Sequence, residues 1–284
     1  MSAQMFVPAG GYLLNTVEFG AGPETFVAHG GWVGSWELWQ QPFQRMQDRW
    51  RCIGYDHRGS GASTAPASAI TPEALVVDLF TVLDGFGVEQ CILAGESLGA
   101  LTCVMAVLRD PSRFAGLVLV DGGYTVRMDS PLIAGSRSNF PGTVHGFVDR
   151  CIPEPDSEHL RRWGRQILLR AEPEAAARLL ECHAEANVAP DLSAIRVPTL
   201  IIHGELDAII PLAVAESAAR TIPDSKLVVI PGAGHVPTLT RPEEVVAAID
   251  DWRALMSGRE ESRPPISIGR EHTGDLAERR KPQA

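Results

Sequence analysis

A serine flanked by glycines is the first candidate for chemistry in this chain. The pentapeptide Gly95-Glu96-Ser97-Leu98-Gly99 follows a short apolar run and precedes a helical pattern. A nucleophilic serine on such a strand-to-helix turn needs small neighbours, and the helix N-terminus supplies backbone N–H groups and a positive dipole end. Glycine usage near 7% produces the bare G-x-S-x-G pattern by chance in roughly one chain in ten, so the flanking elements carry the inference. We predict that Ser97 is a nucleophile; the alternative is a helix-capping serine in a plain turn.

A serine hydroxyl becomes nucleophilic only when a base takes its proton. Among eight histidines, His235 is the best placed, because it follows the last apolar run and the loop Pro231-Gly232-Ala233-Gly234. We therefore predict that His235 is the general base. The other histidines lie in glycine turns, at a strand end, in the central helical region or in the tail: His29, His57, His145, His159, His183, His203 and His272.

The imidazole of such a base needs a carboxylate that sets its tautomer and stabilises its positive charge. Asp207 closes the segment TLIIHGELD, just beyond the next-to-last predicted strand. Glu205, two residues earlier, and Asp121, directly after the run LVLV, are alternatives. We favour Asp207, with Asp121 second. The chain order serine, aspartate, histidine is the one expected when the serine lies on a G-x-S-x-G turn.

Attack on a carbonyl creates an oxyanion, which requires hydrogen-bond donors already in place. One predicted donor is the backbone N–H of Leu98, directly after the serine. The other is the N–H of Gly31 in His29-Gly30-Gly31-Trp32, which resembles the glycine-rich oxyanion loop of esterases. A glycine at this position also serves simply to permit a tight turn.

Short apolar runs alternate with helical patterns along most of the chain, which predicts βαβ units and a mainly parallel sheet covered on both faces. Ligands of such sheets bind beyond the carboxyl ends of the strands, where the predicted site residues lie. The predicted strands are Tyr12 to Phe19, Thr25 to His29, Arg51 to Asp56, Cys91 to Ala94, Gly116 to Asp121, Thr199 to His203 and Lys226 to Ile230. The predicted helices between them are Trp36 to Met46, Pro72 to Gly85, Leu98 to Arg109, Leu212 to Thr221 and Pro242 to Met256.

One region interrupts this alternation. Between residues 122 and 195 there are only helical patterns, such as Ser157 to Arg170 and Glu174 to Ala186. We predict a core domain of residues 1–121 and 196–256, with residues 122–195 as a helical insertion over the sheet. Residues 257–284 are polar and nearly free of large apolar side chains, so we expect a disordered tail.

Composition narrows the classes of partner. The chain has 284 residues, 45% of them hydrophobic, and a net charge of -10. This charge repels phosphate backbones and anionic lipids, so we expect neither nucleic acid nor membrane as a partner.

We predict a cytoplasmic protein with reduced thiols. The five cysteines are scattered, and the sequence shows neither a signal-peptide pattern nor a run of roughly 18 apolar residues. No metal-binding or nucleotide-binding motif occurs, so we expect neither metal nor cofactor, and a homo-oligomer stays open.

Five motifs together carry a resemblance to a known family. HGG near residue 30, YDHRGSGAS at Tyr55 to Ser63, GESLG, HGELD and GAGHVP closely resemble α/β-hydrolase-fold enzymes of the 3-oxoadipate enol-lactonase and carboxylesterase-like group. The resemblance covers the chain from about Tyr12 to Met256. It implies an eight-stranded sheet, a helical cap inserted after the sixth strand, and no cofactor.

We therefore predict a serine hydrolase that cleaves an ester or lactone of a small to medium organic substrate through an acyl-Ser97 intermediate. The same three groups also serve carbon–carbon bond hydrolases, thioesterases, cofactor-free haloperoxidases and slow-turnover ligand receptors. Dehalogenases and epoxide hydrolases of this fold are disfavoured, because they use aspartate at the position of the serine. We expect Trp32, Phe147 and Trp163 to line the substrate pocket. The cap should set specificity without supplying catalytic groups.

Overall fold

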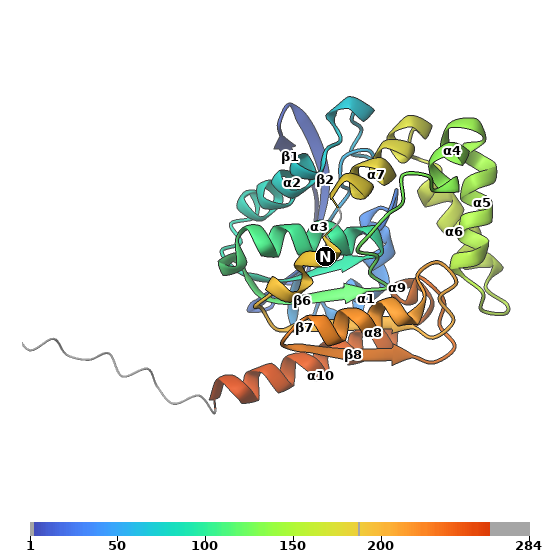
Figure 1. Cartoon of the computed structure of the whole chain (residues 1–284). Coiled ribbons are helices and arrows are strands. Elements are labelled where there is room, and N and C mark those ends of the chain that lie inside the picture. Colours follow the sequence, from blue (N-terminus) through green and yellow to red (C-terminus); the bar gives the residue numbers. More distant parts are fainter. Residues whose placement is uncertain (1–2, 187, 262–284) are drawn as a thin grey trace, which may run out of the picture.

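An eight-stranded sheet with helices on both faces forms the centre of the protein (Figure 1). The computed structural model describes residues 3–186 and 188–261. The strand order is β1-β2-β4-β3-β5-β6-β7-β8, and all neighbours from β4 to β8 pair in parallel, whereas β1 and β2 are antiparallel. The strands are β1 (Ala3–Ala9), β2 (Tyr12–Phe19), β3 (Glu24–His29), β4 (Trp50–Tyr55), β5 (Cys91–Glu96), β6 (Phe114–Val120), β7 (Thr199–Gly204) and β8 (Ser225–Ile230).

The seven strands predicted from the sequence are confirmed, each within two residues at either end. The eighth, β1, was missed. Its sequence AQMFVPA contains Pro8, which lowers the strand propensity of a short run. The structure accommodates this proline because β1 lies at the edge of the sheet, where one row of N–H groups needs no partner.

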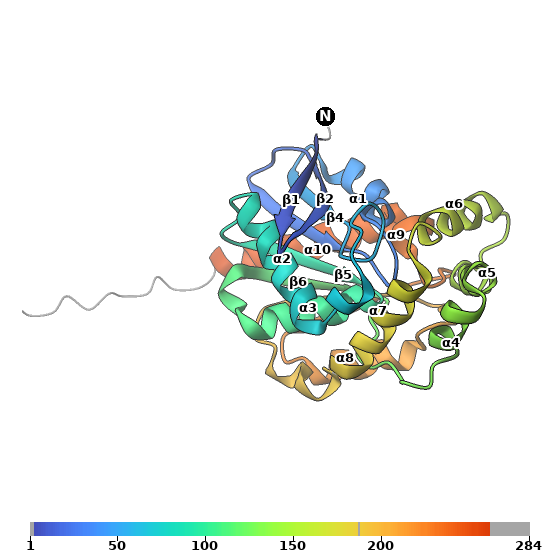
Figure 2. The ribbon, with the colours of Figure 1, turned by 90° about the horizontal axis from the view of Figure 1, so that it is seen from above.

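Two helical layers cover the sheet. The helices α1 (Gln40–Met46) and α10 (Pro242–Glu261) pack on one face, while α2 (Pro72–Gly85), α3 (Leu98–Arg109) and α8 (Leu212–Thr221) pack on the other (Figure 2). Every residue of β5 is buried, as expected for a central strand with helices on both sides. The short elements are η1 (Trp36–Trp39), η2 (Ala67–Ala69), η3 (Pro111–Arg113) and α9 (Pro237–Thr240).

A helical segment joins β6 to β7, and we call it the cap. It comprises α4 (Pro131–Ser138), α5 (Phe140–Cys151), α6 (Glu158–Leu168), α7 (Pro173–Ala186) and η4 (Ala189–Ala194). The cap lies beyond the carboxyl ends of the parallel strands (Figure 1). The two helices predicted here from sequence correspond to α6 and α7, whereas α4 and α5 were not predicted individually.

The C-terminal helix is longer than expected. It continues to Glu261 instead of ending near Met256, so the predicted disordered tail of residues 257–284 begins inside α10. The rest of that predicted tail, residues 262–284, lies outside the described residues. All five cysteines are free and buried. Among the described residues, no helix combines the length and apolar character required to cross a membrane.

Candidate active site

Ser97 lies on a strained turn between β5 and α3. Its backbone has φ 53° and ψ -120°, a conformation that residues other than glycine rarely adopt. The flanking glycines make this turn sterically feasible. A Cβ at Gly95 would lie 2.7 Å from Ala100 Cα, and one at Gly99 would lie 2.3 Å from the carbonyl oxygen of Gly30. The G-x-S-x-G spacing is therefore a packing requirement of this turn.

A chain of hydrogen bonds links three side chains from distant parts of the sequence. The Ser97 hydroxyl lies 2.8 Å from His235 Nε2, and His235 Nδ1 lies 2.7 Å from Asp207 Oδ2. Nδ1–H therefore donates to the carboxylate, which leaves Nε2 free to accept the serine proton. Ser97 is 8% exposed and His235 is 1% exposed, so bulk water competes little with these bonds.

The carboxylate of Asp207 is fixed by its own loop. Its Oδ1 accepts the N–H groups of Ile209 and Ile210 at 2.7 and 2.9 Å. Burial by itself would raise the pKa of Asp207, but the hydrogen bond and charge of His235, with these two amides, hold it below its usual value. Asp207 therefore stays ionised beside the imidazole.

The two alternative acids have other partners. Asp121 Oδ1 accepts the N–H of Gly204 at 2.8 Å, and Glu205 Oε2 accepts the N–H of Gly232 at 2.9 Å. Burial and the neighbouring charge of Asp207 raise the pKa of Asp121 well above its usual value. Of these three acids, Asp207 is the one that hydrogen-bonds His235 in the described structure.

The loop after β3 faces Ser97. A Cβ at Gly31 would lie 3.1 Å from Ser97 Cβ and 3.7 Å from its Oγ, so a side chain at this position would crowd the Ser97 hydroxyl. The ring of His29 hydrogen-bonds the Gly30 carbonyl at 2.6 Å, and the ring of His57 hydrogen-bonds the Gly31 carbonyl at 3.1 Å. Two buried histidines thus fix the peptide planes around the predicted donor Gly31, and the sequence offered no signal for this beyond their positions in turns.

Glu96, the residue before the serine, is a buried acid that the sequence reasoning passed over. It is 0% exposed, and its Oε1 accepts the hydroxyl of Thr238 at 2.9 Å. Burial raises the pKa of Glu96 to about 8, partly offset by that hydrogen bond. At neutral pH this carboxyl is therefore mostly protonated next to Ser97.

One group within residues 3–186 and 188–261 has the spacing of metal ligands. Its members are Asp121, Asp207 and His235, whose candidate ligand atoms lie within 4.8 Å of one another. An ion there would compete with the hydrogen bond between His235 and Asp207. The arrangement therefore fits a proton relay better than a metal centre.

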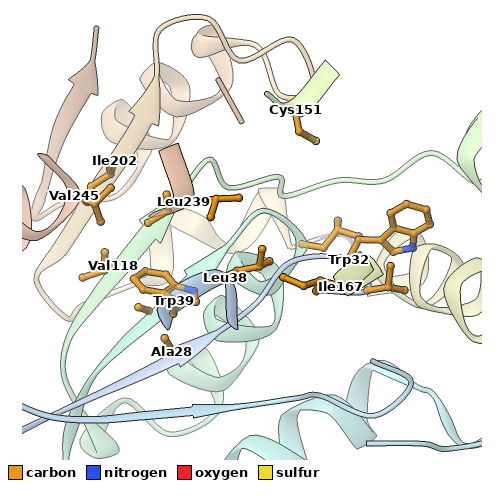
Figure 3. Close-up of a cluster of buried hydrophobic side chains, with 14 of the residues drawn as sticks. Ala28, Trp32, Leu38, Trp39, Val118, Cys151, Ile167, Ile202, Leu239 and Val245 are labelled. Carbon is orange, nitrogen blue, oxygen red and sulfur yellow. The ribbon is translucent and has the colours of Figure 1, made fainter. Parts of the chain in front are cut away.

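Two cavities meet at Ser97, and both are lined by Trp32 and Phe147. The inner pocket, of about 40 Å³, lies between residues 31–34 after β3, α5, α6 and the loop that carries His235. Figure 3 shows four side chains of its wall. These four are Trp32, Leu38, Cys151 and Leu239. The outer pocket, of about 440 Å³, extends past Leu98 to the segment 123–132 and to Ile209 and Ile210.

Of the three predicted pocket residues, Trp32 and Phe147 line both pockets, and Trp163 lines neither. Trp32 is buried, and its indole N–H donates to the carbonyl of Ala176 in the cap at 2.8 Å. The Phe147 ring packs edge-on against Trp32, with ring centroids 5.1 Å apart. Trp163 is half-buried against the hydrophobic core and lines neither pocket, because α6 turns Gly164 and Leu168 toward the inner pocket instead.

Comparisons with known proteins establish the family of this chain. Residues 26–248 match the model of the alpha/beta hydrolase family, so the chain belongs to that family. It is 28% identical to pimeloyl-[acyl-carrier protein] methyl ester esterase of Edwardsiella ictaluri, covering 82% of this chain and 94% of that one. It is 24% identical to the karrikin insensitive 2 receptor CA of Petunia hybrida, with 83% and 93% covered. It is also 26% identical to 3-oxoadipate enol-lactonase 2 of Acinetobacter baylyi, with 75% and 82% covered.

Proposed function

We propose that this protein hydrolyses a carboxylic ester or lactone through an acyl-serine intermediate. The observation that carries the proposal is the unbroken set of hydrogen bonds from Ser97 through His235 to Asp207. Ser97 has a strained backbone conformation and lines both pockets. Each of these groups has a defined role in acyl transfer.

The proposed reaction proceeds in two halves. His235 Nε2 takes the Ser97 proton while Oγ attacks the carbonyl carbon, and the N–H groups of Gly31 and Leu98 stabilise the oxyanion. His235 then gives that proton to the leaving alkoxide, and the C–O bond breaks. In the second half His235 takes a proton from water, hydroxide attacks the acyl carbon, and Ser97 leaves with the proton returned to it.

The two pockets support an assignment of the two parts of the ester. His235 must lie beside the leaving oxygen, because it protonates that atom. The imidazole lines the inner pocket and not the outer one, so the inner pocket takes the alcohol and the outer pocket takes the acyl group. The inner volume of about 40 Å³ suits a small alcohol such as methanol or ethanol, whereas the outer 440 Å³ suits a longer acyl chain.

One relative is consistent with this allocation, because it is named as the esterase of a pimeloyl-[acyl-carrier protein] methyl ester, in which the alcohol part is methanol. Another relative is named as an enol-lactonase, and a lactone has no separate alcohol part. We therefore favour a small-alcohol ester of a larger acid as the substrate class.

A slow-turnover receptor is a second candidate, because one relative of similar coverage is a receptor. Steady turnover of a p-nitrophenyl ester would support the enzyme. A single stoichiometric burst, followed by a stable acyl-protein, would favour the receptor.

The decisive experiment combines labelling with an ester series. A fluorophosphonate should label Ser97 alone, and Ser97→Ala should remain folded while losing on the order of 10⁴-fold to 10⁶-fold in kcat. Methyl, ethyl, butyl and benzyl esters of one acid should show kcat/KM falling sharply as the alcohol grows. Labelling of a different serine would refute the nucleophile, and preference for the bulky alcohol would refute the pocket allocation.

A further inference from the structure

The loop that carries His235 is held by the cap through two consecutive backbone amides. The N–H of Gly234 donates to Glu154 Oε1 at 2.9 Å, and the N–H of His235 donates to the carbonyl of Cys151 at 2.8 Å. Both acceptors lie at the C-terminal end of α5 and just beyond it, about 80 residues away in the sequence. These two hydrogen bonds anchor the backbone of the loop to the cap.

Steric contact closes the loop from both sides. A Cβ at Gly234 would lie 2.3 Å from Pro153 Cδ and 2.4 Å from the Cys151 carbonyl. On the opposite side, a Cβ at Gly204 would lie 2.0 Å from the Gly234 carbonyl. The backbone next to His235 is therefore closely packed between the end of β7 and the cap.

Glu154 is itself fixed in place. It is 3% exposed, and its backbone carbonyl accepts from the guanidinium of Arg161 at 2.8 Å. The same guanidinium donates to the carbonyl of Ile152 at 2.8 Å, which anchors the whole turn to α6. The carboxylate has no ion pair with any residue in the described part of the chain, and its Oε2 is buried without a hydrogen-bond partner. Burial of an oxygen without a hydrogen-bond partner costs folding free energy, which points to a role beyond stability.

We infer that Glu154 is a positioning residue for His235: it holds the Gly234 amide so that the imidazole stays between Ser97 and Asp207. This inference rests on the proposed role of His235 as the base. It revises the expectation that the cap contributes only specificity, because the cap now also sets the geometry of the base. Packing of the cap on the core therefore also positions the His235 imidazole.

The test compares two substitutions with a control. Glu154→Ala removes the acceptor, and Glu154→Gln keeps a side-chain oxygen at the same reach. Glu172→Ala is the matched control, since this residue is an exposed glutamate of the cap. For each variant we would measure kcat and KM with a small activated ester, the rate of fluorophosphonate labelling, and hydrogen exchange at the Gly234 amide.

We expect Glu154→Ala to lower kcat and the labelling rate by about 10-fold to 100-fold with little change in KM, because a misplaced base affects the chemical step. Gly234 amide exchange should accelerate in parallel. Glu154→Gln should recover kcat to within about 3-fold of wild type, since an amide oxygen accepts the same hydrogen bond. Glu172→Ala should match wild type in all three measurements.

The inference fails if folded Glu154→Ala labels at the wild-type rate, or if Glu154→Gln is no better than Glu154→Ala. If Glu154→Ala does not fold, Glu154→Asp replaces it, because the shorter side chain keeps the carboxyl group but draws it away from Gly234. Wild-type kcat in Glu154→Asp would then overturn the inference. Absence of labelling at Ser97 in the wild type would instead refute the proposed function, while amide exchange at Gly234 would still test the anchor.

Discussion

Replacing Glu96 by glutamine should make the protein more stable at alkaline pH. The carboxyl is fully buried beside Ser97, with Oε1 accepting from Thr238 and Oε2 lacking a partner. Its pKa rises from the usual 4.5 to about 8 on folding because burial disfavours the charged form. Glutamine keeps the acceptor for Thr238 and carries no titrating proton.

The direction of the effect follows from proton linkage. Because the folded pKa of Glu96 is the higher one, the folded state binds this proton more tightly than the unfolded state. The resulting stabilisation is complete below pH 4.5, declines as pH rises through the window from 4.5 to about 8, and is lost above it. At about 1.4 kcal/mol per pKa unit, the wild type loses roughly 5 kcal/mol across this window relative to Glu96→Gln.

Urea unfolding of both proteins at intervals from pH 5 to pH 9 measures this difference directly. The free energy of unfolding of Glu96→Gln minus that of the wild type should rise steadily between pH 5 and 8 and level off above. Glu172→Gln, at an exposed position of the cap, provides the control for the change of residue type. A difference that stayed constant over the whole pH range would refute the reasoning, because Glu96 would then titrate alike in both states.

Three further predictions concern the acid, the turn and the pocket. Asp207→Asn should lower kcat by about 10⁴-fold through the wrong imidazole tautomer, whereas Asp121→Asn should be much milder; reversed effects in steady-state kinetics would transfer the role to Asp121. Gly99→Ala should lower the melting temperature and slow fluorophosphonate labelling, because the added methyl group would lie 2.3 Å from the carbonyl oxygen of Gly30; unchanged labelling would argue against this contact. Phe147→Ala should shift kcat/KM between neighbouring chain lengths by about 1 to 3 kcal/mol per methylene while labelling persists, and an unaltered preference would remove this ring from the specificity pocket.

Local patterns in the sequence were sufficient for most of the fold. Strand and helix signals depend on neighbouring residues, so seven strands and the helices that flank Ser97 were predicted within two residues at either end. Strand β1 was not predicted because its short apolar run contains Pro8. Its strand conformation depends on pairing with β2. The extension of α10 past Met256 likewise has no strong local signal, since its last turns are polar.

The sequence by itself determined the order and neighbourhood of Ser97, Asp207 and His235, because each follows a strand whose carboxyl end faces the same edge of the sheet. It could not choose between Asp207 and Asp121 on firm grounds, since both satisfy that rule. The tertiary structure decided this: the Asp207 carboxylate reaches His235 Nδ1, while the Asp121 carboxylate binds the Gly204 amide.

Contacts between the cap and the core lay beyond sequence reasoning altogether. Nothing near Glu154 in the sequence indicates that its carboxylate meets Gly234, and nothing near Trp163 indicates that its ring turns away from the pockets. Such contacts depend on how helices pack across the sheet, and that packing is set by the shapes of many side chains at once. Sequence patterns therefore located the candidate reacting groups, whereas only the folded chain determined which residues contact them.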